Sequence, residues 1–261
     1  MDPYEFTKIP ELSDDQKKSP YAHYYYEPVH PPAQEVFDAV RQGNEMDCSL
    51  ALAPVDVKKL FIPGSLKKYN GYCVLPDDTG FLIIRTQARG YTKELENWFN
   101  GWISDPGYDN LNYKIWLPGL HLSPVGSEIC EDIGWGPVTL EKVPDKYSGL
   151  QDILRASVSA CDICIGMSSI MKPLNPEDAP FKYSLVRTVK LDASGADDVT
   201  CVWCGIHFIG GKPVRVIERG ECVDLERVRL FASHIAWELE RKYYLAPKLF
   251  ALSKEQDRSL E

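Results

Sequence analysis

Short apolar runs separated by turn-forming residues dominate the chain, and most of them are too short for helices. Residues 71–76 and 81–85 form two such runs, and Asp77-Asp-Thr-Gly80 lies between them. This pattern predicts a strand, a turn and a second strand. The same reasoning predicts further strands over Tyr113–Leu117, Val125–Glu131, Val138–Lys142, Val158–Gly166, Tyr183–Leu191, Thr200–Ile209 and Val214–Glu218, with Gly210 and Gly211 joining the last two as a hairpin.

Two other segments have the spacing of amphipathic helices. Thr92 is a suitable N-cap for the first, which Asp105-Pro-Gly107 ends, and Asp224 caps a longer one near the C-terminus. A short helix is also expected over residues 33–41, after Pro31-Pro32. One apolar stripe marks the buried face of each long helix: Leu95, Trp98, Phe99, Trp102 and Ile103 in the first, and Leu225, Val228, Ala232, Ile235, Leu239 and Tyr243 in the second.

This order of elements predicts an α+β fold. Several antiparallel strands followed by one long helix favour a curved sheet that grips the helix, with a cavity between them suited to a small molecule. Residues 66–250 would form this domain, residues 1–65 an N-terminal arm and helical extension, and residues 251–261 a polar tail. The start of the chain shows no regular period, so we expect an irregular arm held by aromatic side chains such as Tyr24, Tyr25 and Tyr26.

Composition narrows the class of protein. Of 261 residues, 44% are apolar and 26% charged, as in ordinary folded proteins, and no apolar run approaches the roughly 20 residues of a membrane span. The first 20 residues are polar and acidic, unlike a secretory signal. A net charge of −9 disfavours a nucleic-acid surface. We therefore expect a cytoplasmic protein that handles a neutral or weakly acidic small molecule, with no nucleic-acid or membrane partner.

Two pairs of cysteines have the Cys-x-x-Cys spacing that occurs in zinc sites, Cys161/Cys164 and Cys201/Cys204. Their neighbours are apolar, which favours strands over metal-binding knuckles. Residues three apart in a strand point to opposite faces, so neither pair could hold one ion. We interpret these cysteines as small buried side chains.

The five histidines include two in the arm, His23 and His30, and three in the body of the chain. His234 and Glu238 are four residues apart in the predicted last helix, so their side chains lie one turn apart on the same side. This spacing allows two ligands to meet one metal ion. A surface pair of helical residues is the alternative interpretation.

His121 follows the predicted strand 113–117 and a Pro-Gly turn, and two acids, Glu128 and Glu131, come shortly after it. A glutamate in an apolar strand is costly to bury unless it is paired or bound to metal. The alternative is a solvent-facing position or a strand end. A set of His and Glu ligands suits zinc, and also iron or manganese.

Four sequence blocks, in order, resemble the diacetylphloroglucinol and phloretin hydrolase family: residues 71–80 (GYCVLPDDTG), 113–121 (YKIWLPGLH), 131–136 (EDIGWG) and 234–238 (HIAWE). The resemblance implies a START-like helix-grip fold and a homodimer. It also implies one zinc ion and hydrolysis of the carbon–carbon bond between a phenolic ring and an acyl group, on an aromatic ketone substrate. The implied ligands are His121, Glu131, His234 and Glu238, and Tyr113 matches a tyrosine near the substrate.

The chain departs from the family pattern at two places. Nine residues separate His121 from Glu131, fewer than in the family, which leaves Glu128 as a competing ligand. The histidine that the family has on a middle strand is absent from residues 163–169. His207, on a later strand, is a candidate replacement as proton donor beside Tyr113, and a structural histidine is the alternative.

Trp116 is expected to stack on the phenolic substrate. Two rival functions share the expected fold, a cyclase or isomerase of polyketides and a carrier of hydrophobic ligands without catalysis. Metal content and product masses separate the three.

Overall fold

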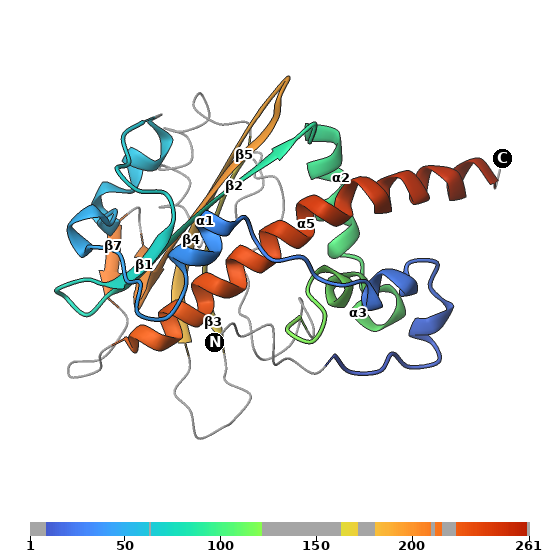
Figure 1. Cartoon of the computed structure of the whole chain (residues 1–261), viewed down its shortest axis with the longest axis horizontal. Coiled ribbons are helices and arrows are strands. Elements are labelled where there is room, and N and C mark those ends of the chain that lie inside the picture. Colours follow the sequence, from blue (N-terminus) through green and yellow to red (C-terminus); the bar gives the residue numbers. More distant parts are fainter. Residues whose placement is uncertain are drawn as a thin grey trace.

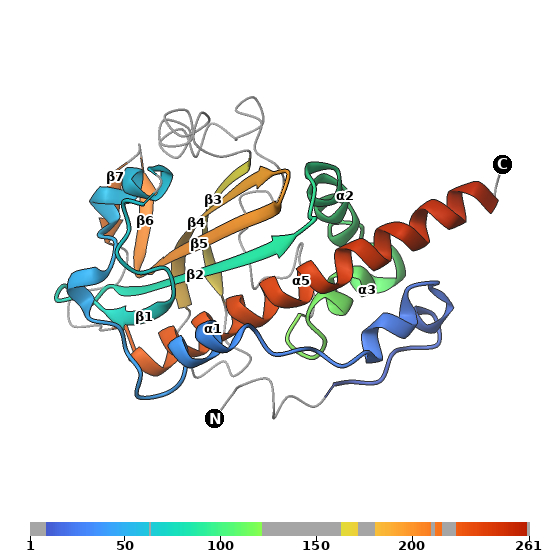
Figure 2. The same cartoon turned by 45° about the horizontal axis from the view of Figure 1, so that its top comes forward.

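The computed structural model describes residues 9–62, 64–121, 163–171, 181–209, 212–215 and 223–259. Its centre is an antiparallel sheet with a long C-terminal helix lying across one face (Figures 1 and 2). The predicted α+β class is confirmed, and the arrangement is that of a helix-grip fold. The strands predicted over Val125–Glu131 and Val138–Lys142 lie outside the described residues.

The main sheet has five strands in the order β1-β2-β5-β4-β3, and every neighbouring pair is antiparallel. The predicted hairpin of residues 71–85 and the predicted strand Tyr183–Leu191 are confirmed as β1–β2 and β4. The predicted strand Val158–Gly166 corresponds in part to β3. The strands are β1 (Gly71–Val74), β2 (Gly80–Arg89), β3 (Ile163–Met171), β4 (Phe181–Asp192) and β5 (Gly195–Cys204).

The predicted single strand Thr200–Ile209 is wrong, because the strand is interrupted at Gly205. This glycine has φ of 84°, a left-handed conformation that ends the ladder. β5 ends before this glycine, at Cys204. Its start, at Gly195, comes earlier than the predicted start at Thr200. The residues that follow form β6 (Ile206–Ile209), which pairs with β7 (Lys212–Arg215) in a separate two-stranded sheet.

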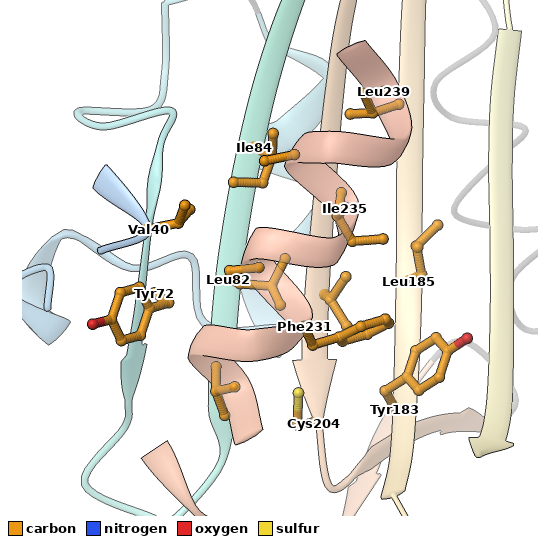
Figure 3. Close-up of a cluster of buried hydrophobic side chains, with 14 of the residues drawn as sticks. Val40, Tyr72, Leu82, Ile84, Tyr183, Leu185, Cys204, Phe231, Ile235 and Leu239 are labelled. Carbon is orange, nitrogen blue, oxygen red and sulfur yellow. The ribbon is translucent and has the colours of Figure 1, made fainter. Parts of the chain in front are cut away.

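The long helix α5 (Leu225–Ser259) begins where the sequence predicts, with Asp224 Oδ1 accepting a hydrogen bond from the backbone N–H of Glu226 at 2.9 Å. Residues expected as a polar tail after 250 continue this helix. Its predicted apolar stripe packs on the sheet. Figure 3 shows Leu82 and Ile84 of β2 facing Ile235 and Leu239 of α5, together with Phe231, Tyr183 and Leu185.

The opposite face of the sheet is covered by the N-terminal extension. Alternate residues of the strands, such as Phe81, Ile83 and Trp203, form a second core with residues of η4 (Cys48–Leu50) and η5 (Pro54–Phe61). Cys204 belongs to the core under α5 and Cys201 to this second core, so the two thiols lie on opposite faces, as predicted. Burial raises the pKa of both thiols, which suits inert core residues.

The described part of the N-terminal arm, from residue 9 onward, reaches α1 (Gln34–Ala39) alongside α5 (Figure 1). It forms the short helices η2 (Gln16–Lys18) and η3 (Ala22–Tyr26), and α1 follows within the predicted helix 33–41. Arg241 of α5 is buried and donates hydrogen bonds to the backbone carbonyls of Pro28 (2.9 Å) and Tyr24 (2.7 Å). These hydrogen bonds hold the arm against α5, together with the packing of Tyr24 and Tyr25.

Two helices pack beside the C-terminal half of α5 (Figure 2). The first, α2 (Lys93–Ile103), has its predicted cap, with Thr92 Oγ1 accepting from Leu95 N–H at 3.2 Å. The second, α3 (Gly107–Trp116), shows that the predicted strand Tyr113–Leu117 is wrong. Leu111, Ile115 and Trp116 are buried together because they share one side of a helix.

A cluster of four buried charges joins α2, the sheet and α5. One carboxylate oxygen of Glu96 on α2 lies 2.5 Å from Lys242 Nζ of α5. The other lies 3.1 Å from Arg187 Nη1 of β4. Arg187 also pairs with Asp198 of β5, to which the Tyr243 hydroxyl donates at 2.6 Å. Glu96, Asp198 and Lys242 are at most 1% exposed. The cluster contains two acids and two bases, so it is neutral and links four elements.

No helix in the described ranges is both long enough and apolar enough to span a bilayer.

Candidate metal centre

His121 is held at the end of a turn that follows α3. The His121 backbone N–H donates to the carbonyl of Leu117 at 2.9 Å, and Gly119 in between has φ of 81°, which a residue with a side chain rarely adopts. The Pro-Gly turn therefore folds the chain back on the end of the helix. This places the His121 ring beside α3 in a buried position, with 4% of the residue exposed.

His234 and Glu238 lie one turn apart on α5, as their spacing predicts. Glu238 is only 7% exposed, and a quarter of the His234 side chain is exposed. The surface interpretation of the pair is therefore wrong for Glu238. Both side chains are directed to His121, which comes from a distant part of the sequence.

Three potential ligand atoms converge at this point. His234 Nε2 lies 3.3 Å from His121 Nε2 and 3.3 Å from Glu238 Oε2, and His121 Nε2 lies 3.9 Å from the same carboxylate oxygen. Two ligand atoms about 2.1 Å from one zinc ion at a tetrahedral angle are about 3.4 Å apart. The two separations from His234 match this value closely, and the separation of His121 from Glu238 is about 0.5 Å longer. Among the described residues, these three form the one group of His, Cys, Asp and Glu side chains that could hold an ion.

The protonation state of His121 also suits metal binding. Burial, and then the charge of His234, hold the pKa of His121 well below its usual value, so the ring is neutral. Its Nδ1 lies 3.3 Å from the backbone oxygen of Tyr113. A carbonyl only accepts hydrogen bonds, so Nδ1 carries the proton and Nε2 presents its lone pair to His234 and Glu238. This is the arrangement that orients histidine ligands in metal sites.

Tyr113 and Trp116 surround His121 because α3 is a helix. Three residues apart, they lie on one side of it. The Tyr113 ring stacks on the His121 ring, with centroids 4.2 Å apart and an angle of 6° between the planes. The Trp116 ring meets His121 edge-on at 4.8 Å, and its indole N–H donates to the backbone carbonyl of Glu238 at 2.9 Å. In a strand the two side chains would point to opposite faces.

The other predicted site residues are not brought together by the described structure. Glu131 and the competing Glu128 lie outside the described residues, so the choice between them stays a prediction. His207 lies on β6, and its side chain is outside what the structure describes. The substrate roles of Tyr113 and Trp116 also stay predictions.

Sequence reasoning missed two contacts of the site, the carbonyl of Tyr113 on His121 and the bond from Trp116 to Glu238. It also missed Tyr183, whose ring packs at 4.7 Å on Phe231, one turn before His234 (Figure 3). The spacing of Leu111, Ile115 and Trp116 would have revealed the helix. No local signal could have paired Trp116 with a residue 122 positions away.

A family model matches part of the chain. The model of the DAPG hydrolase PhiG domain matches residues 52–133. The resemblance to the diacetylphloroglucinol hydrolase family is thereby confirmed. The matched range includes Tyr113, Trp116, His121 and Glu131, while His234 and Glu238 lie beyond it. No curated protein matches the chain significantly. The match to the diacetylphloroglucinol hydrolase family supports a hydrolase that acts on phloroglucinol compounds.

Proposed function

We propose that this protein is a zinc-dependent hydrolase that cleaves the carbon–carbon bond between a phloroglucinol-type ring and an acyl group. The observation that carries the proposal is the convergence of His121, His234 and Glu238 at metal-ligand distances. The match of residues 52–133 to a diacetylphloroglucinol hydrolase domain supports the choice of reaction and substrate class.

The donor set fits zinc. Two imidazole nitrogens and one carboxylate are ligands that zinc commonly takes, and Glu131 is proposed as the fourth, with Glu128 in reserve. Iron and manganese accept similar ligands, so the ion is to be identified by analysis. When bound, zinc supplies Lewis acidity to a substrate oxygen or to water.

The proposed reaction consumes one water molecule. The bond from the ring carbon to the acyl carbon breaks, the acyl carbon gains the hydroxyl of water, and the ring carbon gains a proton. The products are a carboxylic acid and a deacylated phenol. A phenolic hydroxyl on the ring assists by taking the keto form as the ring carbon is protonated.

The chain must supply the proton to the ring carbon. We propose Tyr113 for this role because its ring stacks directly on His121, which places it beside the ligands. His207 is the second candidate, on β6. A general acid must come within hydrogen-bond reach of the atom that it protonates, so the two can be separated by substitution.

Metal analysis of the purified protein with turnover of an acylphloroglucinol in the same samples tests the proposal. The wild-type chain should hold one ion, and His234→Ala should lose both the ion and turnover. His23→Ala is the matched control, because His23 lies in η3 of the arm and is not one of the three converging side chains. Unchanged metal content in His234→Ala would contradict the site.

Product masses test the reaction itself. Hydrolysis gives two fragments whose summed mass exceeds the substrate by one water. An isomer of unchanged mass would indicate a cyclase or isomerase, and unchanged substrate with no bound metal would indicate a carrier.

The homodimer implied by the family resemblance is proposed as well, and light scattering checks it.

A further inference from the structure

We propose that Trp116 is a positioning residue for the metal ligands, which fixes Glu238 and His121 relative to each other. The inference rests on the proposed metal site. It gives Trp116 a role toward the ligands in place of the expected stacking on the substrate.

The first observation is the bond from the indole to the backbone of a ligand. Trp116 Nε1 donates to the carbonyl oxygen of Glu238 at 2.9 Å, and this bond is buried. A carbonyl in a helix already accepts from the N–H four residues later, and its second lone pair is free for another donor. The indole therefore attaches the turn of α5 that carries Glu238 directly to α3.

The second observation is the packing of the same ring. The Trp116 ring meets His121 edge-on with the centroids 4.8 Å apart, and it also meets Phe99 of α2 edge-on at 5.7 Å. Because the buried indole contacts both rings, its packing restrains the position of the imidazole. Trp116 thus contacts two proposed ligands that belong to segments far apart in the sequence.

The third observation is burial. Trp116 is 3% exposed, its N–H is bonded to the protein, and its edges pack on other rings. Little of its surface is left for a substrate. Partners that orient ligands typically cost a factor of 10 to 100 in metal affinity when they are removed.

The test is Trp116→Phe, which keeps an aromatic ring and removes the N–H. Metal affinity, measured by competition with a chromophoric chelator, should fall by roughly 10- to 100-fold. The visible spectrum of the Co²⁺-substituted protein should change as well, because the ligand geometry changes. At saturating metal, KM for an acylphloroglucinol should stay near the wild-type value.

Trp102→Phe is the matched control. Trp102 is also a buried tryptophan, on α2, but its Nε1 has no hydrogen-bond partner within the described structure. The same chemical change there should leave metal affinity and the Co²⁺ spectrum unchanged. Equal losses in both variants would show a general packing effect and overturn the proposal.

The proposal would also be overturned if Trp116→Phe bound metal with wild-type affinity. If KM were raised at the same time, the result would support stacking of Trp116 on the substrate. If Trp116→Phe does not fold, replacing Trp116 by benzothienylalanine gives the same comparison, since this residue fills the indole volume without the N–H. A wild-type protein that binds metal but does not hydrolyse acylphloroglucinols would contradict the proposed function and leave the role of Trp116 intact.

Discussion

His121 shows how much of the proposed metal site is prepared by the protein alone. The Tyr113 carbonyl selects the tautomer, burial keeps the ring neutral, and Tyr113 and Trp116 fix the ring plane. A ligand that is already neutral and oriented loses little freedom when an ion binds. Glu238 differs, because its carboxylate would neutralise part of the charge of a bound cation.

The charge of Glu238 can be removed with little change of shape. We predict that Glu238→Gln lowers metal affinity by more than the roughly 100-fold that outer-shell changes reach, because an amide is a poor substitute for a carboxylate ligand. Isothermal titration with Zn²⁺ measures this. Glu240→Gln, two residues further along α5 and directed elsewhere, should bind as the wild type does. Equal affinities of Glu238→Gln and Glu240→Gln would remove Glu238 from the site.

Sequence could predict His121, His234 and Glu238 at the residue scale because of helix spacing and ordered sequence blocks. It could not predict that Trp116 bonds to the Glu238 carbonyl, because this pairing depends on how α3 meets α5. The same limit applies to Glu96. On a helix its position adjoins the predicted apolar stripe, but its partners Arg187 and Lys242 are distant in sequence.

At the scale of elements, local pattern predicted the helices with caps and the strands with clear turns. Thr92 and Asp224 are the residues that fix the starts of α2 and α5. The two wrong strand predictions concern segments in which one residue changes the secondary structure. Gly205 divides an apolar run whose pattern predicts one strand. The run Tyr113–Leu117 is helical because its buried face includes Leu111, which lies before the run.

The buried pair of Glu96 and Lys242 joins two of these elements, α2 and α5. Lys242→Met should destabilise the protein by about 3–5 kcal/mol, because it leaves Glu96 buried with one cationic partner fewer. The double variant Glu96→Leu/Lys242→Met should recover most of this loss, since the remaining Arg187 and Asp198 still pair. Urea unfolding of the wild type, both single variants and the double variant gives the coupling energy. Additive losses would show that the pair is not coupled.

At the scale of the whole molecule, the charge cluster makes stability depend on pH. Burial alone would raise the pKa of Glu96, but the charges of Lys242 and Arg187 and the hydrogen bonds from Lys242 and Asn100 outweigh it and lower the pKa to about 2. In the unfolded chain a glutamate titrates near 4.3. A carboxyl with a depressed folded pKa stabilises the protein above its unfolded pKa, and this stabilisation is lost as the pH falls toward the folded pKa.

We therefore predict that Glu96 contributes about 3 kcal/mol at neutral pH, which is lost between about pH 5 and pH 2. Urea midpoints measured across this range should fall more steeply for the wild type than for Glu96→Leu/Lys242→Met. Carboxylates outside the cluster contribute equally to both proteins, so the difference between the two curves isolates the contribution of the cluster. Parallel curves would assign the acid sensitivity to other groups.

The separation of His121 from His234 by 113 positions has a consequence for how the protein is made. During synthesis His121 leaves the ribosome long before the segment with His234 and Glu238, and β3, β4 and β5 of the central sheet emerge in between. A nascent chain therefore cannot assemble the three ligands until α5 has been translated and has docked. Metal loading in the cell would then mark chains that are complete and folded, and chains truncated before α5 would stay without the ion.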